Sequence, residues 1–210
     1  MHILLTDILC CPRCGPEFGL IVLSDEIEDR QVIRGYLGCS NCRQRYGITN
    51  GIADLRQASA ERRAPAPGAR EDGDRVYRLA ALLGVTTSNA NLLIVEPGDS
   101  LSAGIAEILP QAHIINASTD SHSAGGNVGF LSRVLVGEGL PFRNATMRGA
   151  AFAGLFSVDL AREAARVLMP GARLVIDEAS DEVAREVRAL GYQVQLEQER
   201  VVVAAVPGPR

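Results

Sequence analysis

Four cysteines form two pairs with the same spacing, and this pattern is the strongest chemical signal in the sequence. Cys11 and Cys14 make one C-x2-C pair, and Cys39 and Cys42 make the other, with residues 15–38 between them. Each pair places two sulfur atoms at one tight turn, so two turns can surround one metal ion. Four thiolates close a tetrahedral zinc site, with Zn–S distances of about 2.3 Å and no position left for water. The spacing therefore predicts a structural rather than a catalytic Zn²⁺.

Two disulfides, an iron–sulfur cluster and free thiols are the alternative states of these cysteines. Disulfides need an oxidising compartment, and Met1–Leu9 has no Lys or Arg and only a short apolar run, unlike an export signal. We therefore expect a cytoplasmic protein. Cys10 is a fifth cysteine, but its C-x3-C step to Cys14 suits a metal turn poorly. We expect Cys10 to be a small buried residue.

The composition of the 210 residues excludes some classes of function. Hydrophobic residues make up 47% of the chain, but no apolar run reaches the ~18 residues that a membrane helix needs, so we expect no membrane partner. A net charge of −4 gives no support to nucleic-acid binding by bulk charge, although a local arginine patch stays open. Aromatic residues make up 4%, too few to predict a stacking platform for single strands.

Three segments differ in composition. We expect residues 1–57 to form a small β-rich domain around the cysteines, residues 58–74 to be a linker rich in Ala, Pro, Gly and charge, and residues 75–210 to form a second domain. About 57 residues bury little apolar surface, whereas a structural zinc contributes roughly 10–16 kcal/mol to such modules. Loss of metal is therefore expected to unfold the first domain and spare the second.

Strand and helix patterns alternate in the second domain. Apolar strands are expected at 91–96, 112–116, 132–136, 149–155 and 173–176, helices at 75–83, 100–109, 158–168 and 180–190, and an antiparallel strand pair at 192–197 and 200–206. Such alternation predicts a mostly parallel sheet covered on both faces. The fold class is thus α/β, a small β-rich unit followed by a Rossmann-like sheet with an antiparallel C-terminal strand. We expect His113 at a sheet edge and Arg162, Glu163 and Arg166 on a solvated helix face.

Two stretches of the first domain, LTDILCCPRC and LGCSNCRQRYGITNGIADL, carry a family pattern. They resemble the zinc-ribbon activators of tRNA, rRNA and release-factor methyltransferases, with a Leu/Ile lead into C-P-x-C, then C-x-x-C, an aromatic residue and Gly-Ile. Gly47 stands where that family usually has Pro, and Cys10 where it often has Ala. The resemblance implies a zinc ribbon of the kind that docks on a methyltransferase and stabilises it.

Two stretches of the second domain, GEGLPF at 137–142 and AREAARVLMPGARLVI at 161–176, resemble class I S-adenosylmethionine methyltransferases. The resemblance implies cofactor-binding positions at Glu96, which ends the first strand, at Gly98 in the following turn, and at Asp120 after the second strand. These three residues are the candidate cofactor site if S-adenosylmethionine binds.

Several residues depart from the methyltransferase pattern. Ser100 and Ser102 replace later glycines of the cofactor turn, where glycine lets the backbone approach the ligand closely. The second strand ends in Asn116-Ala117-Ser118, with no acid before Asp120, and Arg148 stands where the family usually has Asp. We therefore expect no S-adenosylmethionine binding and assign no catalytic residue.

Three functions follow from these observations. The first is a non-catalytic, methyltransferase-derived scaffold or interaction subunit, which binds a protein partner or itself. The second is an active S-adenosylmethionine-dependent methyltransferase of unknown substrate, because such enzymes work mainly by positioning the two reactants. The third is a stabilising subunit of another methyltransferase, with an exposed ribbon strand that extends the partner's sheet.

Overall fold

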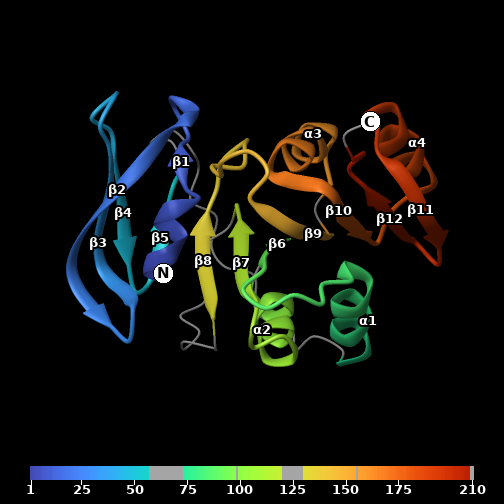
Figure 1. Cartoon of the computed structure of the whole chain (residues 1–210), viewed down its shortest axis with the longest axis horizontal. Helices are drawn as coiled ribbons and strands as arrows, with labels where there is room; N and C mark the ends of the chain where they lie inside the picture. Colours follow the sequence, from blue (N-terminus) through green and yellow to red (C-terminus); the bar gives the residue numbers. More distant parts are fainter. Residues whose placement is uncertain (57–72, 98, 120–129, 155, 209–210) are drawn as a thin grey trace.

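The computed structural model describes residues 1–56, 73–97, 99–119, 130–154 and 156–208. Its strands form one twelve-stranded sheet in the order β1-β2-β3-β4-β5-β8-β7-β6-β9-β10-β12-β11 (Figure 1). The strands are β1 (Cys10–Cys11), β2 (Gly15–Glu28), β3 (Gln31–Cys39), β4 (Arg45–Thr49), β5 (Ile52–Asp54), β6 (Asn91–Val95), β7 (His113–Ser118), β8 (Leu131–Leu135), β9 (Met147–Ala153), β10 (Leu168–Asp177), β11 (Gln193–Gln198) and β12 (Val201–Ala205). The helices are η1 (Ile3–Asp7, a 3-10 helix), α1 (Gly73–Leu83), α2 (Ser100–Ile108), α3 (Val158–Val167) and α4 (Asp181–Ala189).

The C-terminal two thirds of the chain form the expected α/β sheet. Strands β8, β7, β6, β9 and β10 are parallel neighbours, and β12 runs antiparallel to both β10 and β11. Helices α1 and α2 cover one face, and α3 and α4 cover the other (Figure 1). The predicted fold class is therefore confirmed, including the antiparallel C-terminal strand.

Local sequence explains where these elements begin. The strand β6 is apolar throughout its buried part, as expected for a strand covered on both faces. The helix α3 begins after Ser157, whose hydroxyl accepts the N–H of Leu160 at 3.1 Å, and Asp159 lies in its first turn. Both features stabilise a helix N-terminus, so the start of α3 agrees with the sequence prediction.

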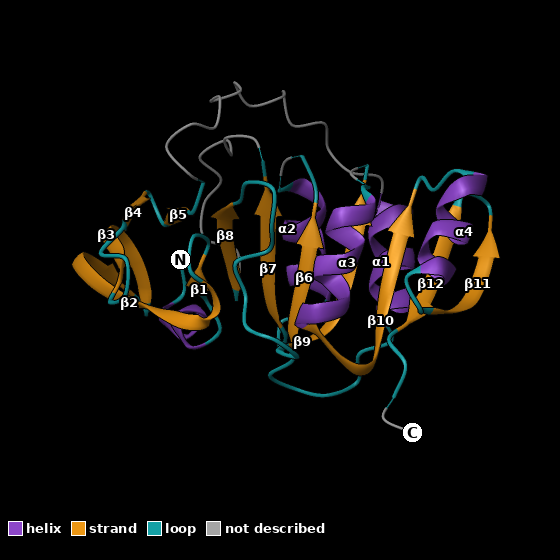
Figure 2. Cartoon of the chain, turned by 90° about the horizontal axis from the view of Figure 1, so that it is seen from above, coloured by secondary structure: helices purple, strands orange, loops and turns teal. Residues whose placement is uncertain are grey.

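The cysteine-containing part is not separate from the α/β sheet. Its last strand, β5, pairs in parallel with β8, so that Ile52 lies opposite Arg133 and Asp54 opposite Leu135. Strands β1 to β5 thereby continue the α/β sheet past its β8 edge (Figures 1 and 2). An otherwise exposed edge strand is covered, which removes an aggregation-prone surface.

A second contact joins the two parts on the α3/α4 face. The connection from β8 to β9, residues 136–146, contains no helix. The segment after η1 lies against it instead: Cys10 N–H donates to Pro141 O and Arg143 N–H donates to Ile8 O, at 2.9 and 2.8 Å. Leu9 and Phe142 pair as an isolated bridge and both have no exposed surface. The N-terminal part thus covers the sheet where a helix is missing, and a single hydrophobic cluster spans both parts.

Some expectations about single elements were wrong. His113 lies in the central strand β7 rather than at an edge; its ring stacks on Phe130 at 4.1 Å, and burial lowers its pKa to about 3. The strand β2 is long, its outward side chains are exposed and it contains bulges. The buried Cys10 agrees with its expected role. Among the described residues, no helix is both long and apolar enough to cross a bilayer.

Candidate functional site

Four cysteine sulfurs lie together at one end of the N-terminal sheet. Those of Cys11, Cys14, Cys39 and Cys42 are all within 4.8 Å of one another. The Cys11–Cys42 and Cys14–Cys39 sulfur pairs are 3.7 and 3.8 Å apart. A tetrahedron with metal–sulfur distances of about 2.3 Å has edges of about 3.8 Å. The four side chains are therefore spaced for one tetrahedral ion rather than for two disulfides, whose S–S bonds are about 2.05 Å.

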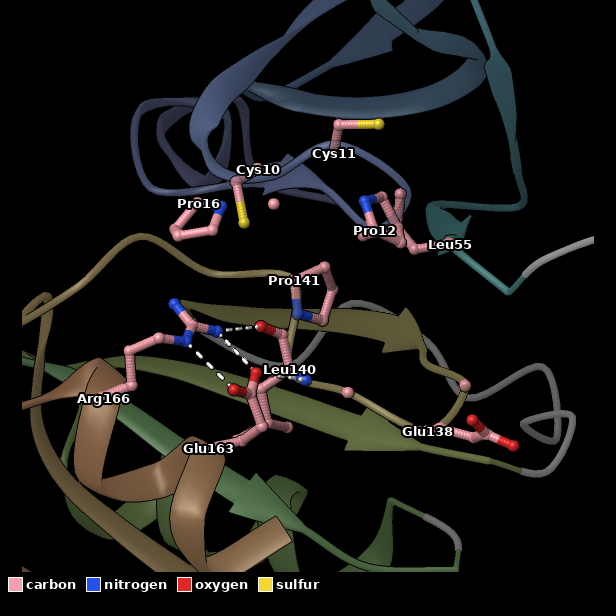
Figure 3. Close-up of a pocket in the computed structure, with 13 residues that line it drawn as sticks. Cys10, Cys11, Pro12, Pro16, Leu55, Glu138, Leu140, Pro141, Glu163 and Arg166 are labelled. Atoms are coloured by element: carbon pink, nitrogen blue, oxygen red, sulfur yellow. Dashed lines mark hydrogen bonds and ion pairs between the residues drawn. The ribbon is translucent and has the colours of Figure 1, made fainter. Parts of the chain in front are cut away.

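Neighbouring side chains also face these sulfurs. Asn41 Nδ2 donates to Cys14 Sγ at 3.3 Å, and the Tyr46 hydroxyl lies 3.5 Å from Cys11 Sγ. Hydrogen bonds of this kind orient metal ligands and stabilise thiolates. Cys10 is excluded from the group: Figure 3 shows the Cys10 sulfur directed away from that of Cys11. Burial raises the pKa of the Cys10 thiol to about 11.

The second candidate site lies where β6 and β7 end, and its central residue is Glu96. Only 3% of Glu96 is exposed. Its carboxylate accepts the N–H groups of Leu101 at 3.2 Å and Ser102 at 2.8 Å, in the first turn of α2. It also accepts the Ser102 hydroxyl and Asn116 Nδ2, the latter at 3.0 Å. Burial raises the pKa of the Glu96 carboxyl above its usual value, while the hydrogen bonds from Ser102 and Leu101 lower it in part. Glu96 therefore holds α2 on the sheet.

Three other polar side chains form hydrogen bonds near Glu96 at these strand tips. The Ser118 hydroxyl, at the end of β7, donates to Pro97 O at 3.1 Å and so links the tips of β6 and β7. Asp99 accepts from Arg133 Nε of β8 at 2.6 Å. Gly98 and Asp120, two of the three candidate cofactor residues, lie outside the described residues.

The described residues at these strand tips already serve the protein's own structure. In the methyltransferase pattern an acid follows the second strand and binds the ribose; here β7 ends at Ser118, whose hydroxyl bonds to Pro97 O, and Asp120 lies outside the described residues. Glu96 is the one described candidate cofactor residue, and its carboxylate accepts four protein donors. A ligand would have to break these buried hydrogen bonds, which costs free energy unless it replaces them.

A third polar group, Arg166 of α3, holds the loop with the GEGLPF sequence. Its Nε donates to Glu163 Oε1 at 3.1 Å, and Nη2 donates to Glu163 Oε2 and Leu140 O, each at 2.7 Å. Its Nη1 donates to Phe142 O at 2.6 Å and to Asn144 Oδ1 at 3.0 Å. These five bonds use all five N–H groups of a guanidinium. Figure 3 shows those to Glu163 and Leu140. The expectation that Arg162, Glu163 and Arg166 share a solvated face is therefore wrong for Glu163 and Arg166.

Asn116, Arg133 and Arg166 were not predicted to be parts of these sites. Asn116 and Arg133 offered one usable signal, because a polar residue inside an apolar strand must find a partner when it is buried. Arg166 offered none, since an i,i+3 pair with Glu163 is typical of exposed helices.

Solved structures with the same fold are methyltransferases of low sequence identity. A candidate S-adenosyl-L-methionine-dependent methyltransferase from Methanococcus maripaludis matches with a TM-score of 0.50 and 10% identity, over 66% of this chain and 85% of that chain. A geranyl diphosphate methyltransferase, solved with GPP and sinefungin, matches with a TM-score of 0.48 and 13% identity, over 59% of this chain. The present chain spans 61% of that enzyme's length.

One further match is the complex between the Haloferax volcanii Trm112 methyltransferase activator and a candidate methyltransferase, with a TM-score of 0.48 and 12% identity, over 64% of this chain and 91% of that chain. No protein-family model and no curated protein matches the sequence. The comparisons therefore show a methyltransferase-type Rossmann fold and nothing finer.

Proposed function

We propose that this chain is a non-catalytic, methyltransferase-derived protein that acts as a scaffold or interaction subunit. The observation that supports the proposal is the set of hydrogen bonds that the described residues make at the tips of β6 and β7. Glu96 is used to anchor α2, and the Ser118 hydroxyl bridges to Pro97. Both groups serve the protein's own structure where a methyl donor would need free polar groups and space.

We further propose that Cys11, Cys14, Cys39 and Cys42 hold one structural Zn²⁺ in a zinc ribbon. The sulfur spacing and the absence of a fifth cysteine from the group support this assignment. Four protein thiolates fill a tetrahedral zinc ion, so the ion would fix the two turns and would not bind substrate. None of the five cysteines is in a disulfide, which favours a reducing compartment such as the cytoplasm.

The comparisons give no support to the expectation that S-adenosylmethionine does not bind. The M. maripaludis protein is itself a candidate S-adenosylmethionine-dependent methyltransferase. The proposal therefore depends on the residues of this chain at the tips of β6 and β7, and an active methyltransferase stays the alternative. That alternative is favoured by the position of Glu96, which lies at the tip of β6 as the methyltransferase pattern requires.

Calorimetry with S-adenosylmethionine and S-adenosylhomocysteine tests the proposal. We expect no heat beyond dilution when either compound is titrated into the full chain, with an active class I methyltransferase as positive control. A saturable isotherm in the micromolar range would contradict the proposal and favour the active enzyme. A Ser118→Asp variant, which supplies an acid at the tip of β7, is also expected to bind neither compound, because the Glu96 carboxylate is still bonded to its protein donors.

The third hypothesis is a stabilising subunit for another methyltransferase. The ribbon strand β5 cannot extend a partner's sheet, because it already pairs with β8 of the same chain. At the other edge, β1 pairs with β2 through Gly15 and Gly19, so residues 20–28 of β2 are the ribbon strand that could extend a partner's sheet or pair with a second copy of the chain. A pull-down that recovers a stoichiometric methyltransferase would favour the third hypothesis, and a defined homo-oligomer by size-exclusion chromatography with light scattering would favour self-association.

A further inference from the structure

A pocket of about 720 Å³ lies between the cysteine turns and the α/β sheet. One wall is the stretch from Cys10 to Pro16, and the opposite wall is the loop from Gly137 to Pro141 (Figure 3). Leu55, which directly follows β5, and Glu163 of α3 complete it. The volume is that of a drug-sized ligand site, and such sites often form where two parts of a fold meet.

The pocket lies outside the carboxyl ends of two parallel strands. Strand β5 ends at Asp54 and β8 ends at Leu135, and the residues that follow them, Leu55 and Gly137, both line it. Loops after the carboxyl ends of parallel strands are the usual place for ligands in α/β proteins. The pocket is distinct from the Glu96 site. Glu96 bonds to α2, which packs on the opposite face of the sheet.

The walls of the pocket include three proline rings. Figure 3 shows the rings of Pro12, Pro16 and Pro141 around the space, together with Leu55. Such surfaces suit a flat apolar body, because proline rings lose little conformational freedom when they are covered.

The charged groups of the lining leave one carboxylate without a counter-ion. Glu163 is paired with Arg166 at 2.7 Å, and Arg166 has no N–H group left for a ligand. Glu138 lies at one end of the pocket and is exposed, and within the described parts of the chain no group bonds to it (Figure 3). The lining therefore offers an anionic group and no free cation, which disfavours phosphates and carboxylates as ligands.

We propose that this pocket binds a small organic cation, an amine, amidinium or guanidinium on an apolar body, with the apolar body between the proline rings and the cationic group at Glu138. A Zn²⁺ held by four thiolates would have a net negative charge and would favour the same sign of ligand. That contribution alone rests on the proposed metal site.

Three probes of the same shape test the charge preference. Benzamidine is cationic, benzamide is neutral and benzoate is anionic, and each is titrated into the ¹⁵N-labelled full chain while amide shifts are followed by NMR. We expect saturable shifts at Leu55 and Gly139, with benzamidine bound more tightly than benzamide and benzoate not bound. Absence of these shifts, equal affinities or tighter binding of benzoate would overturn the proposal.

A pair of variants tests the assignment to Glu138. Glu138→Gln is expected to weaken benzamidine about three- to fivefold, since an exposed ion pair is worth about 1 kcal/mol at most. Glu107→Gln, the same change on the exposed side of α2, is the matched control and should leave the affinity unchanged. An unchanged affinity in Glu138→Gln would overturn the assignment.

A second variant tests the pocket without altering charge. A Cβ on Gly137 would meet no atom within 4 Å, so Gly137→Leu can be accommodated and should fill part of the space. We expect benzamidine binding to be lost while the unfolding midpoint stays the same. Retained binding in this variant would place the ligand elsewhere and overturn the proposal.

Competition separates this proposal from the proposed function. Displacement of benzamidine by S-adenosylmethionine would assign the pocket to the methyl donor and overturn both proposals. S-adenosylmethionine binding without displacement would contradict only the non-catalytic function and leave the cation site in place.

Discussion

At the scale of single residues, Arg166 and Glu96 form hydrogen bonds that join segments of the chain. Arg166 is the clearest case, because its guanidinium bonds to the carbonyl oxygens of Leu140 and Phe142, and both residues are buried. Glu96 does the same for α2. Removing such a group leaves its partners buried and unpaired, which costs more than the net value of the bonds.

We expect Arg166→Ala to lower the free energy of unfolding by roughly 2–4 kcal/mol, because it leaves two buried carbonyls and Glu163 without their donor. Arg162→Ala on the same helix is the matched control. Its ion pair with Asp159 is exposed, with 63% and 81% of the two side chains accessible, so its loss should cost about 1 kcal/mol or less. Urea unfolding followed by far-UV circular dichroism measures both. Equal losses would show that Arg166 is an ordinary surface residue.

At the scale of elements, local pattern predicted the strands and helices of the α/β part but not how they associate. The apolar run in β6 and the spacing of apolar residues in α3 are local signals and were interpreted correctly. Nothing local tells β5 to lie beside β8, since strand order depends on contacts between residues far apart in the sequence. The group of four cysteines was also predictable from the sequence, because the spacing of metal ligands within each pair is a local pattern.

The hydrogen bonds around Glu96 were predictable only in part. The departures at Ser100, Ser102 and Ser118 were visible in the sequence as missing glycines and a missing acid. That Ser102 and Asn116 both donate to Glu96 follows from β6, β7 and α2 meeting at one point, which no spacing in the sequence expresses. The pocket beside Glu138 was not foreseen for the same reason, because its two walls are more than a hundred residues apart in the chain.

The contact between residues 8–10, which directly precede Cys11, and the connection from β8 to β9 can be tested at Phe142. Phe142 has no exposed surface and pairs with Leu9 across the junction. Phe142→Ala should lower the free energy of unfolding by about 3–5 kcal/mol, as for other buried phenylalanines. Phe18→Ala on β2, where 37% of the side chain is exposed, is the control and should cost less than about 1.5 kcal/mol. Similar losses in the two variants, measured by urea unfolding, would mean that the junction contributes little.

At the scale of the whole molecule, the ribbon and the α/β sheet are structurally continuous. They share the twelve-stranded sheet through β5 and β8 and one hydrophobic cluster around Leu9 and Phe142. The sequence suggested a ribbon that unfolds alone when metal is lost. The shared sheet and cluster lead to a different expectation. The N-terminal part covers the β8 edge and the part of the sheet face that no helix covers, so its unfolding would expose both.

Metal removal distinguishes the two expectations. Treatment with a chelator, or Cys39→Ser, should abolish the bound zinc (about one ion per chain) and also lower hydrogen-exchange protection in β8 and β7, since their cover is lost with the ribbon. Cys10→Ala is the matched control, because Cys10 lies outside the sulfur group, and it should keep both the zinc and the protection. Mass spectrometry of exchanged peptides measures protection strand by strand. If only residues 1–56 lose protection while β8 and β7 keep it, the ribbon is an independent domain and the shared core adds no cooperativity.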